Sequence, residues 1–174
     1  MVELISDCSK CAALCCMALD FDRSDMFAFD KKAGEPCRHL RGDFGCGIHE
    51  NLDKSGMKGC GQYQCDGAGQ RVVQEVFSGR NWLDDPALRL PMIAAFGEMR
   101  QVHRQLVLLK AAEALALGPD QKTELARLRA QLSPPGGWTE ALLAEVETSG
   151  IMTELRAFFT GLRALAPKPG HGTE

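Results

Sequence analysis

Hydrophobic residues recur at helical intervals through the second half of the chain. A stretch that opens at Asp85-Pro86, an N-cap followed by proline at the first helical position, carries apolar residues spaced along one helical face. These residues are Met92, Ala95, Met99, Val102, Leu106 and Leu109. The pattern predicts one amphipathic helix of roughly seven to nine turns, kinked or restarted if Pro91 interrupts it.

Three shorter helices are predicted after this one. Gly118-Pro119 ends the long helix, and Asp120 is placed to cap the second. The third starts near Trp138. The fourth has the most regular helical spacing in the sequence, at Ile151, Leu155, Phe158, Leu162 and Leu165. Short connections between such helices favour an antiparallel bundle of about four helices.

The N-terminal part of the chain has a different pattern. Its helical periodicity is poor and its glycines are frequent, so it contains too few apolar residues to build a core of its own. A short helix is predicted over Gln70–Phe77. We therefore expect a mainly α protein with four parts: an irregular cysteine-rich metal-binding module at 1–69, a short helix and linker at 70–84, the helical bundle at 85–166 and a flexible tail at 167–174.

Composition and charge narrow the class of protein. The 174 residues are 45% hydrophobic and 25% charged, which excludes disorder over most of the length. The 20 basic residues do not outnumber the 23 acidic ones, so we expect no nucleic-acid partner. The most apolar window, 106–117, contains Lys110 and Glu113, and no basic segment precedes the apolar run 11–19. We therefore expect a cytoplasmic protein without a membrane partner.

Cysteine is the most informative residue type in this sequence. All eight cysteines fall within the first 65 positions, at Cys8, Cys11, Cys15, Cys16, Cys37, Cys46, Cys60 and Cys65. Without an export signal, a reducing compartment disfavours four disulfides, and clustered cysteines then indicate metal ligands. Thiolates are the ligands that zinc and iron–sulfur clusters prefer.

The first four cysteines have the spacing of ligands to a shared centre. Cys8 and Cys11 form a CxxC pair, and on a helical turn Cys15 would share their face. Cys16 would point about 100° away from Cys15 on the same turn. The spacing leaves open whether Cys16 faces a second metal, bridges two metals or is not a ligand.

Two histidines accompany the downstream cysteines. His39 follows Cys37, and His49 follows Cys46, each within ligand spacing. We treat His39 and His49 as candidate metal ligands or as hydrogen-bond donors to the ligands, the alternative being exposed loop histidines.

The order of the cysteines resembles the signature of the CxxCxxCC, or YkgJ-like, family of zinc- or iron-chelating domains. That signature is a CxxC, a nearby CC pair, a Cys before a leucine, a Cys-x-Ile element and a further Cys. The matching positions are Cys8, Cys11, Cys15, Cys16, Cys37 with Leu40, Cys46 with Ile48, and Cys60. The resemblance spans about residues 8–65 and implies a zinc or iron centre held by these cysteines. His49 stands where the family usually has tyrosine. The family includes flagellin lysine methylases.

Two kinds of centre remain open from the residues. One 4Fe-4S cluster uses four thiolates and leaves four over, whereas two zinc sites use all eight. Eight thiolates around two dications, however, carry a formal charge of about −4, which would need abundant hydrogen-bond donors. With the resemblance added, the balance slightly favours an iron–sulfur cluster with an electron-transfer or enzyme-accessory role and a protein partner. The alternative is a zinc-stapled interaction module without catalysis of its own.

Other conspicuous side chains are expected to be structural. His103 lies on the apolar face of the long helix and is a core or boundary histidine rather than a ligand. The two tryptophans are expected to anchor the core. Phe21, Phe27 and Phe29 are expected to pack the cysteine-rich module against the bundle.

Overall fold

The chain folds almost entirely as helices, turns and loops. The computed structural model describes residues 2–165, so the predicted tail at 167–174 lies outside the described residues. Within residues 2–165 there are seven α-helices and no strand, which confirms the mainly α fold. The α-helices are α1 (Leu14–Ala18), α2 (Lys58–Gln62), α3 (Ala68–Arg71), α4 (Arg89–Ala112), α5 (Pro119–Gln131), α6 (Glu140–Glu145) and α7 (Ile151–Gly161). Shorter helical turns are η1 (Cys8–Lys10), η2 (His49–Asn51), η3 (Val72–Val76), η4 (Pro86–Leu88) and η5 (Arg163–Leu165).

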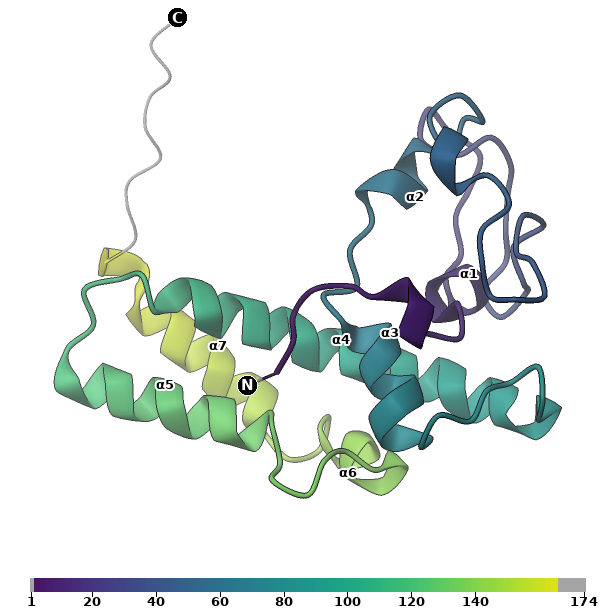
Figure 1. The fold of residues 1–174 in the computed structure, drawn as a ribbon. Coiled ribbons are helices and arrows are strands. Elements are labelled where there is room, and N and C mark those ends of the chain that lie inside the picture. The colour runs from purple at the N-terminus through teal and green to yellow at the C-terminus, as the bar shows by residue number, and fades with distance from the viewer. Residues whose placement is uncertain (1, 166–174) are drawn as a thin grey trace, which may run out of the picture.

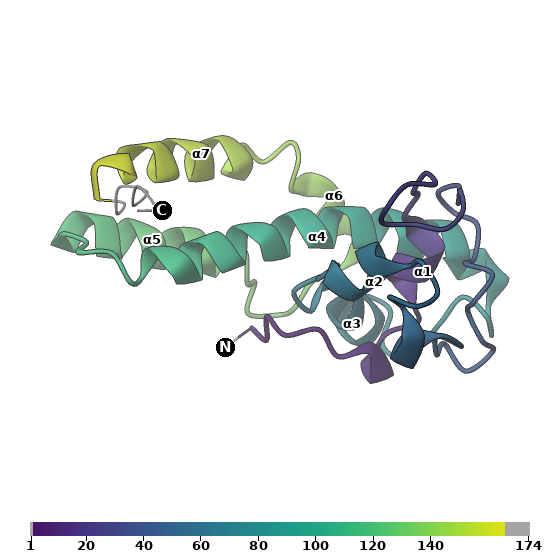
Figure 2. The ribbon, with the colours of Figure 1, turned by 90° about the horizontal axis from the view of Figure 1, so that it is seen from above.

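Helix α4 is the long axis of the molecule, and α1, α3, α5 and α6 pack against it (Figures 1 and 2). Its 24 residues make somewhat under seven turns at about 3.6 residues per turn. The helix is slightly shorter than predicted because the residues after Asp85 form the 3₁₀ turn η4, which Asp85 caps by accepting a hydrogen bond from Ala87 N–H at 3.1 Å. Pro91 lies in the first turn of α4, where its missing N–H needs no helical partner, so the helix is continuous.

Helix α5 begins two residues earlier than a cap at Asp120 would place it. The N-cap is Gly118, whose N–H donates to the Gln121 side chain at 2.9 Å, and Asp120 is already inside the helix. The prediction that Asp120 caps this helix was therefore wrong. The physical reason is Pro119, because proline is favoured at the first helical position and fixes the helix start there.

The segment between the two parts is not the single helix predicted over Gln70–Phe77. It consists of α3 followed by the π-helical turn η3, in which Phe77 N–H donates to the Val72 carbonyl at 3.0 Å. The β-branched valines of this run restrict their own rotamers in an α-helix, which weakens a regular helix there. Nearer the C-terminus, α6 is short and is capped by the Thr139 hydroxyl, which accepts from Leu142 N–H at 3.2 Å.

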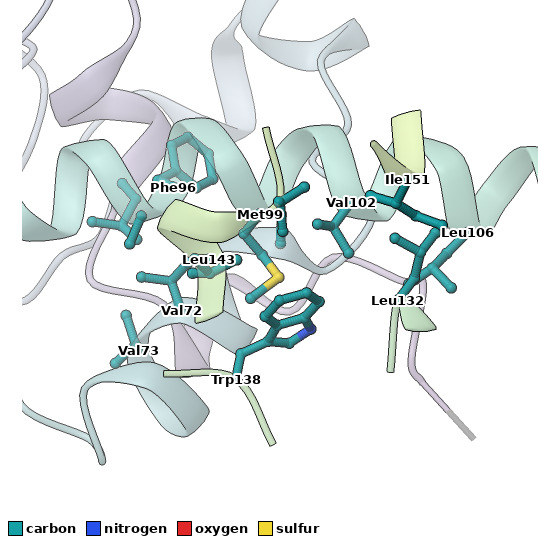
Figure 3. Packing of buried hydrophobic residues seen from close by; sticks show 14 of the residues in the cluster. Val72, Val73, Phe96, Met99, Val102, Leu106, Leu132, Trp138, Leu143 and Ile151 are labelled. Atoms are coloured by element: carbon teal, nitrogen blue, oxygen red, sulfur yellow. The ribbon is translucent and has the colours of Figure 1, made fainter. Parts of the chain in front are cut away.

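One hydrophobic core joins the helices to part of the cysteine-rich segment. Figure 3 shows the side chains of Met99 and Val102 from α4 beside Trp138 and Leu143 from the α6 region. The same cluster contains Ala12, Leu14 and Met17 from α1 and the turn before it. Leu14 and Met17 are fully buried, so packing holds α1 in place, against the expectation that the module lacks a core.

The loops between α1 and α2 project from the helical layer (Figure 1). Phe21 stacks on Phe27 with ring centroids 4.3 Å apart, and Phe29 meets Phe21 edge-on at 5.4 Å. None of these three rings belongs to the core cluster, so the prediction that they pack the module against the bundle was wrong. They form a small aromatic cluster within the loops instead.

The buried histidine and tryptophans lie where the pattern predicts. His103 is 1% exposed, and its ring Nδ1 lies 2.5 Å from the Asp66 carbonyl oxygen. Trp82 and Trp138 are both buried in the core, and Trp82 Nε1–H donates to the Ala12 carbonyl at 2.8 Å. Across residues 2–165, no helix is both long and apolar enough to cross a membrane.

Candidate metal centre

The eight cysteines of the sequence are all free thiols, carried by turns and short helices near the N-terminal half of α4 (Figure 1). Cys8 and Cys60 are exposed and the other six are half-buried. The thiols therefore line the part of the chain that has the least regular secondary structure, where backbone movement costs least.

The first three cysteines do not share one helical face. Cys8 begins η1, Cys11 is extended, and Ala13 adopts a left-handed conformation with φ +50° before α1 begins. The expectation of a single turn with Cys8, Cys11 and Cys15 on one side was therefore wrong. The left-handed residue interrupts the helical path between Cys11 and Cys15.

Cys65 joins this region from 50 residues further along the chain. Its Sγ lies 3.3 Å from the Ser6 hydroxyl, in hydrogen-bond contact. The Gln70 side chain fixes the same two segments together, because its Nε2 donates to the Ile5 carbonyl at 3.1 Å and its Oε1 accepts from Asp7 N–H at 2.5 Å.

Cys11 lies directly on the backbone of α3. A Cβ at Gly69 would stand 2.6 Å from the Cys11 Sγ, closer than real Cβ atoms approach, so only glycine allows this contact. Burial raises the pKa of the Cys11 thiol to about 12, while an N–H from Leu14 opposes the rise and charges on Cys15, Cys65 and Cys8 add to it.

These four cysteines define the first thiol group: Cys8, Cys11, Cys15 and Cys65. Burial also raises the pKa of Cys8, and negative charge on Cys15 and Cys65 raises it further. Charge interactions between partly exposed groups fade beyond about 10 Å, so the four sulfurs share one neighbourhood.

The other four cysteines define the second thiol group: Cys16, Cys37, Cys46 and Cys60. Cys37 N–H donates to the Cys16 carbonyl at 3.0 Å, and an isolated antiparallel bridge pairs Leu40 with Cys46. Burial raises the pKa of Cys60 to about 11, with further rises from charge on Cys37, Cys15 and Cys46. Cys37 and Cys46 also act on Cys16, whose pKa is raised first by its hydrogen bond to Cys15.

Cys15 and Cys16 lie where the two thiol groups meet. Their Sγ atoms are 3.9 Å apart, within hydrogen-bond range for sulfur. The hydrogen bond with Cys16 lowers the pKa of Cys15 to about 7, against the effect of burial, and backbone N–H groups at the start of α1 lower it further.

Lys31 is a buried cation beside the second thiol group. The residue is 6% exposed, and its Nζ donates hydrogen bonds to three carbonyl oxygens, those of Met17, Leu19 and Lys32. Within residues 2–165 no carboxylate lies within ion-pair distance of Lys31. Burial lowers the pKa of Lys31, whereas charge on Cys37 and Cys16, and then on Asp20 and Glu35, raises it.

The two candidate histidines differ in their surroundings. The ring of His39 packs edge-on against Phe29 with centroids 5.6 Å apart, and its carbonyl accepts from Gly47 N–H at 2.8 Å. His49 is exposed at the start of η2. Two groups of four thiols need neither histidine to complete a ligand set.

The sulfurs of each group are neighbours but do not yet converge on one point. Among the described residues, no three Cys, His, Asp or Glu side chains are arranged as they stand to hold one ion. The donor chemistry nevertheless fits a thiolate-ligated metal, since each group supplies four soft ligands. Metal binding would have to draw the four sulfurs of each group together as the site folds around the metal.

Two features of the site have no signal in the sequence. Nothing around Lys31 distinguishes it from the adjacent Lys32, yet only Lys31 is buried beside thiols. Ser6 is hydrogen-bonded to Cys65 and Gln70 to Ile5, each more than 55 positions away in the sequence. Contacts over such a separation produce no local sequence pattern. The pairing of Cys65 with the CxxC segment was therefore not foreseeable from spacing.

Comparison with known proteins adds one relative. The chain is 39% identical over 123 residues to the uncharacterized protein YybG of Bacillus subtilis (strain 168), a match that covers 71% of this chain and 44% of YybG. The chain thus spans less than half the length of this relative. Because 109 residues follow Cys65, a match of 123 residues reaches into the cysteine-containing part. No family model matches the chain, and no solved structure matches it.

Proposed function

We propose that this protein binds metal through the cysteines of its N-terminal part, with an iron–sulfur cluster as the favoured centre. One observation carries the proposal: the eight thiols, spread over positions 8 to 65, lie close enough that charge on one shifts the pKa of others, although no three converge on one point as they stand. Four thiolates are the full ligand set of a 4Fe-4S cluster and equally of a structural zinc ion.

The number of cysteines does not distinguish an iron–sulfur centre from a zinc centre. Two clusters and two zinc ions would each use all eight thiols. The charge does not separate them either, because a 4Fe-4S cluster or a zinc ion with four thiolates carries about −2 in both cases. The buried Lys31 ammonium offsets part of that charge for either metal.

The cysteine order supports the iron–sulfur proposal. It resembles the CxxCxxCC family, which includes flagellin lysine methylases, and a cluster in a chain without an evident catalytic constellation suits electron transfer or an accessory role to an enzyme. Such a role requires a protein partner that receives or supplies the electron. A cytoplasmic location, where thiols stay reduced, fits this chemistry.

The contact between Cys15 and Cys16 favours zinc as the second candidate. Their sulfurs are 3.9 Å apart and belong to different thiol groups, so two centres would be near neighbours. Single ions fit such a separation more easily than two eight-atom clusters do. In that case the protein is a zinc-stapled interaction module without catalysis of its own.

Anaerobic purification followed by elemental analysis, sulfide assay and a visible spectrum tests the proposal. Iron with acid-labile sulfide and a visible absorption that dithionite bleaches is the result expected for the favoured centre. Colourless protein with stoichiometric zinc overturns the iron–sulfur assignment and selects the interaction module. Protein without metal after growth in iron- and zinc-supplemented medium overturns metal binding altogether.

A further inference from the structure

We propose that the cysteines form two separate four-thiolate centres, Cys8/Cys11/Cys15/Cys65 and Cys16/Cys37/Cys46/Cys60, which load independently of one another. This inference rests on the proposed function and deepens it, because it assigns every cysteine to a centre.

The backbone geometry separates the two centres. The first group is fixed to the helical layer, since Cys11 lies on α3 at Gly69, and Ser6 and Gln70 fasten Cys65 to the CxxC segment. In the second group, Cys37 and Cys46 lie in the projecting loops, where Cys37 N–H donates to the Cys16 carbonyl and Cys46 is bridged to Leu40. Cys16 lies on α1 and Cys60 on α2. Among residues 2–165, no hydrogen bond joins Cys8 or Cys11 to Cys37, Cys46 or Cys60.

Helix α1 explains how adjacent cysteines serve different centres. Successive residues of a helix point about 100° apart, so Cys15 and Cys16 face different surroundings. Charge on Cys15 acts on Cys8 and Cys11, and charge on Cys37 and Cys46 acts on Cys16. Cys15 lies at the junction of the two groups, and its charge also acts on Cys16 and Cys60. The fully buried neighbours Leu14 and Met17 hold α1 in this orientation.

The two centres also differ in their surroundings. Lys31 places a buried positive charge near Cys16, Cys37 and Cys60, and near Cys15 at the junction. Three backbone carbonyls hold this ammonium in place without neutralising it. Four thiolates around a dication carry a net charge of about −2, and the Lys31 ammonium brings the local net charge to about −1. The second centre can for this reason sit in exposed loops without an additional cationic partner.

Two double variants with the same number of lost thiols test the partition. Cys8→Ser/Cys11→Ser removes two ligands from the first group, and Cys11→Ser/Cys46→Ser removes one from each group. Metal per chain is measured on anaerobically purified protein, with far-UV circular dichroism as the check that α4 to α7 remain folded. Ser9→Ala, an exposed change between the first two cysteines, serves as the control.

Independent centres predict that the first double variant keeps about half the metal of the unmodified chain and that the second keeps almost none. The single variants Cys11→Ser and Cys46→Ser should each keep about half. Complete loss in either single variant, or equal loss in the two double variants, overturns the partition while leaving metal binding intact. Absence of metal from the unmodified chain is instead a failure of the proposed function.

Discussion

Gly69 lies so close to Cys11 that a Cβ at position 69 would stand 2.6 Å from the cysteine Sγ. We predict that Gly69→Ala displaces Cys11 from the first thiol group, because the new methyl would overlap the Cys11 Sγ, with the buried Phe96 ring already in van der Waals contact at 3.6 Å. Overpacking of this kind costs about 1–3 kcal/mol of unfolding free energy. Chemical denaturation and metal content of the purified variant measure the two effects.

Gly97→Ala is the matched control for this change. Gly97 is an exposed residue of α4 with no heavy atom within 4 Å of an added Cβ. Alanine there should raise stability by about 0.5–1 kcal/mol, since glycine is unfavourable inside a helix. Equal metal content in both alanine variants would show that the Gly69–Cys11 contact has no part in the centre.

Lys31→Met tests the role of the buried cation. Methionine fills the space of the lysine side chain but leaves the second thiol group without its nearby positive charge. Loss of a residue that supports metal ligands lowers metal affinity by about 10- to 100-fold. We therefore expect faster transfer of metal to a competing chelator, followed by absorbance.

Lys32→Met removes the same charge from the adjacent, exposed position and should leave the chelator kinetics unchanged. If the two lysine variants lose metal at the same rate, net charge of the chain and not the buried ammonium sets the affinity.

His103 makes the stability of the fold depend on pH. Burial lowers the pKa of His103 below its ordinary value of 6.5, against the effect of the Asp66 carbonyl, and its Nε2 is buried without a hydrogen-bond partner. Because the folded chain binds the proton less readily than the unfolded chain, this contribution is fully present above about pH 6.5 and declines as the pH falls below it. Unfolding free energies measured between pH 7.5 and 5 should therefore decrease toward acid more steeply than for His103→Gln.

The exposed His49 supplies the comparison. The unfolding free energy of His49→Gln should decrease toward acid as steeply as that of the unmodified chain. A His103→Gln curve parallel to both would contradict a role for the buried imidazole.

Removal of the metal should loosen the loops and spare the helical core. The projecting loops between α1 and α2 contain Cys37 and Cys46, whereas α1 itself is anchored by the buried Leu14 and Met17. Limited proteolysis after chelation is expected to cut within residues 20–57 and to leave a fragment that contains α4 to α7. Cleavage throughout the chain would mean that the core also depends on the metal.

The helices could be predicted where packing follows a local period. The apolar spacing of 92–109 corresponds to the buried face of α4, and Ile151 and Leu155 form the buried face of α7, because each of these helices buries a stripe that recurs every turn. The prediction that Leu165 continues this face was wrong, since Leu165 lies in η5 beyond the helix and is 37% exposed. The start of α5 was predicted wrongly because Asp120 is a favourable N-cap residue, whereas Pro119 is favourable at the first helical position. The helix in fact begins at Pro119. The π turn η3 has no period to detect.

The chemistry of the site could be predicted only as a residue type. Cysteine clustering indicates thiolate ligands, but the division into groups depends on the left-handed turn at Ala13 and on contacts such as Ser6 with Cys65. The left-handed conformation of Ala13 and the hydrogen bond between Ser6 and Cys65, which are 59 positions apart, produce no periodic pattern in the sequence. Lys31 was missed for the same reason, since burial of a single lysine is decided by tertiary structure.

Native mass spectrometry of the anaerobically purified chain tests the central claim, that two groups of four thiols each hold a metal centre. We expect a mass above that of the 174-residue polypeptide by two metal centres, and a half-loaded species when Cys11 or Cys46 is replaced by serine. A mass equal to that of the polypeptide alone, with all eight thiols open to alkylation in the folded chain, would contradict it.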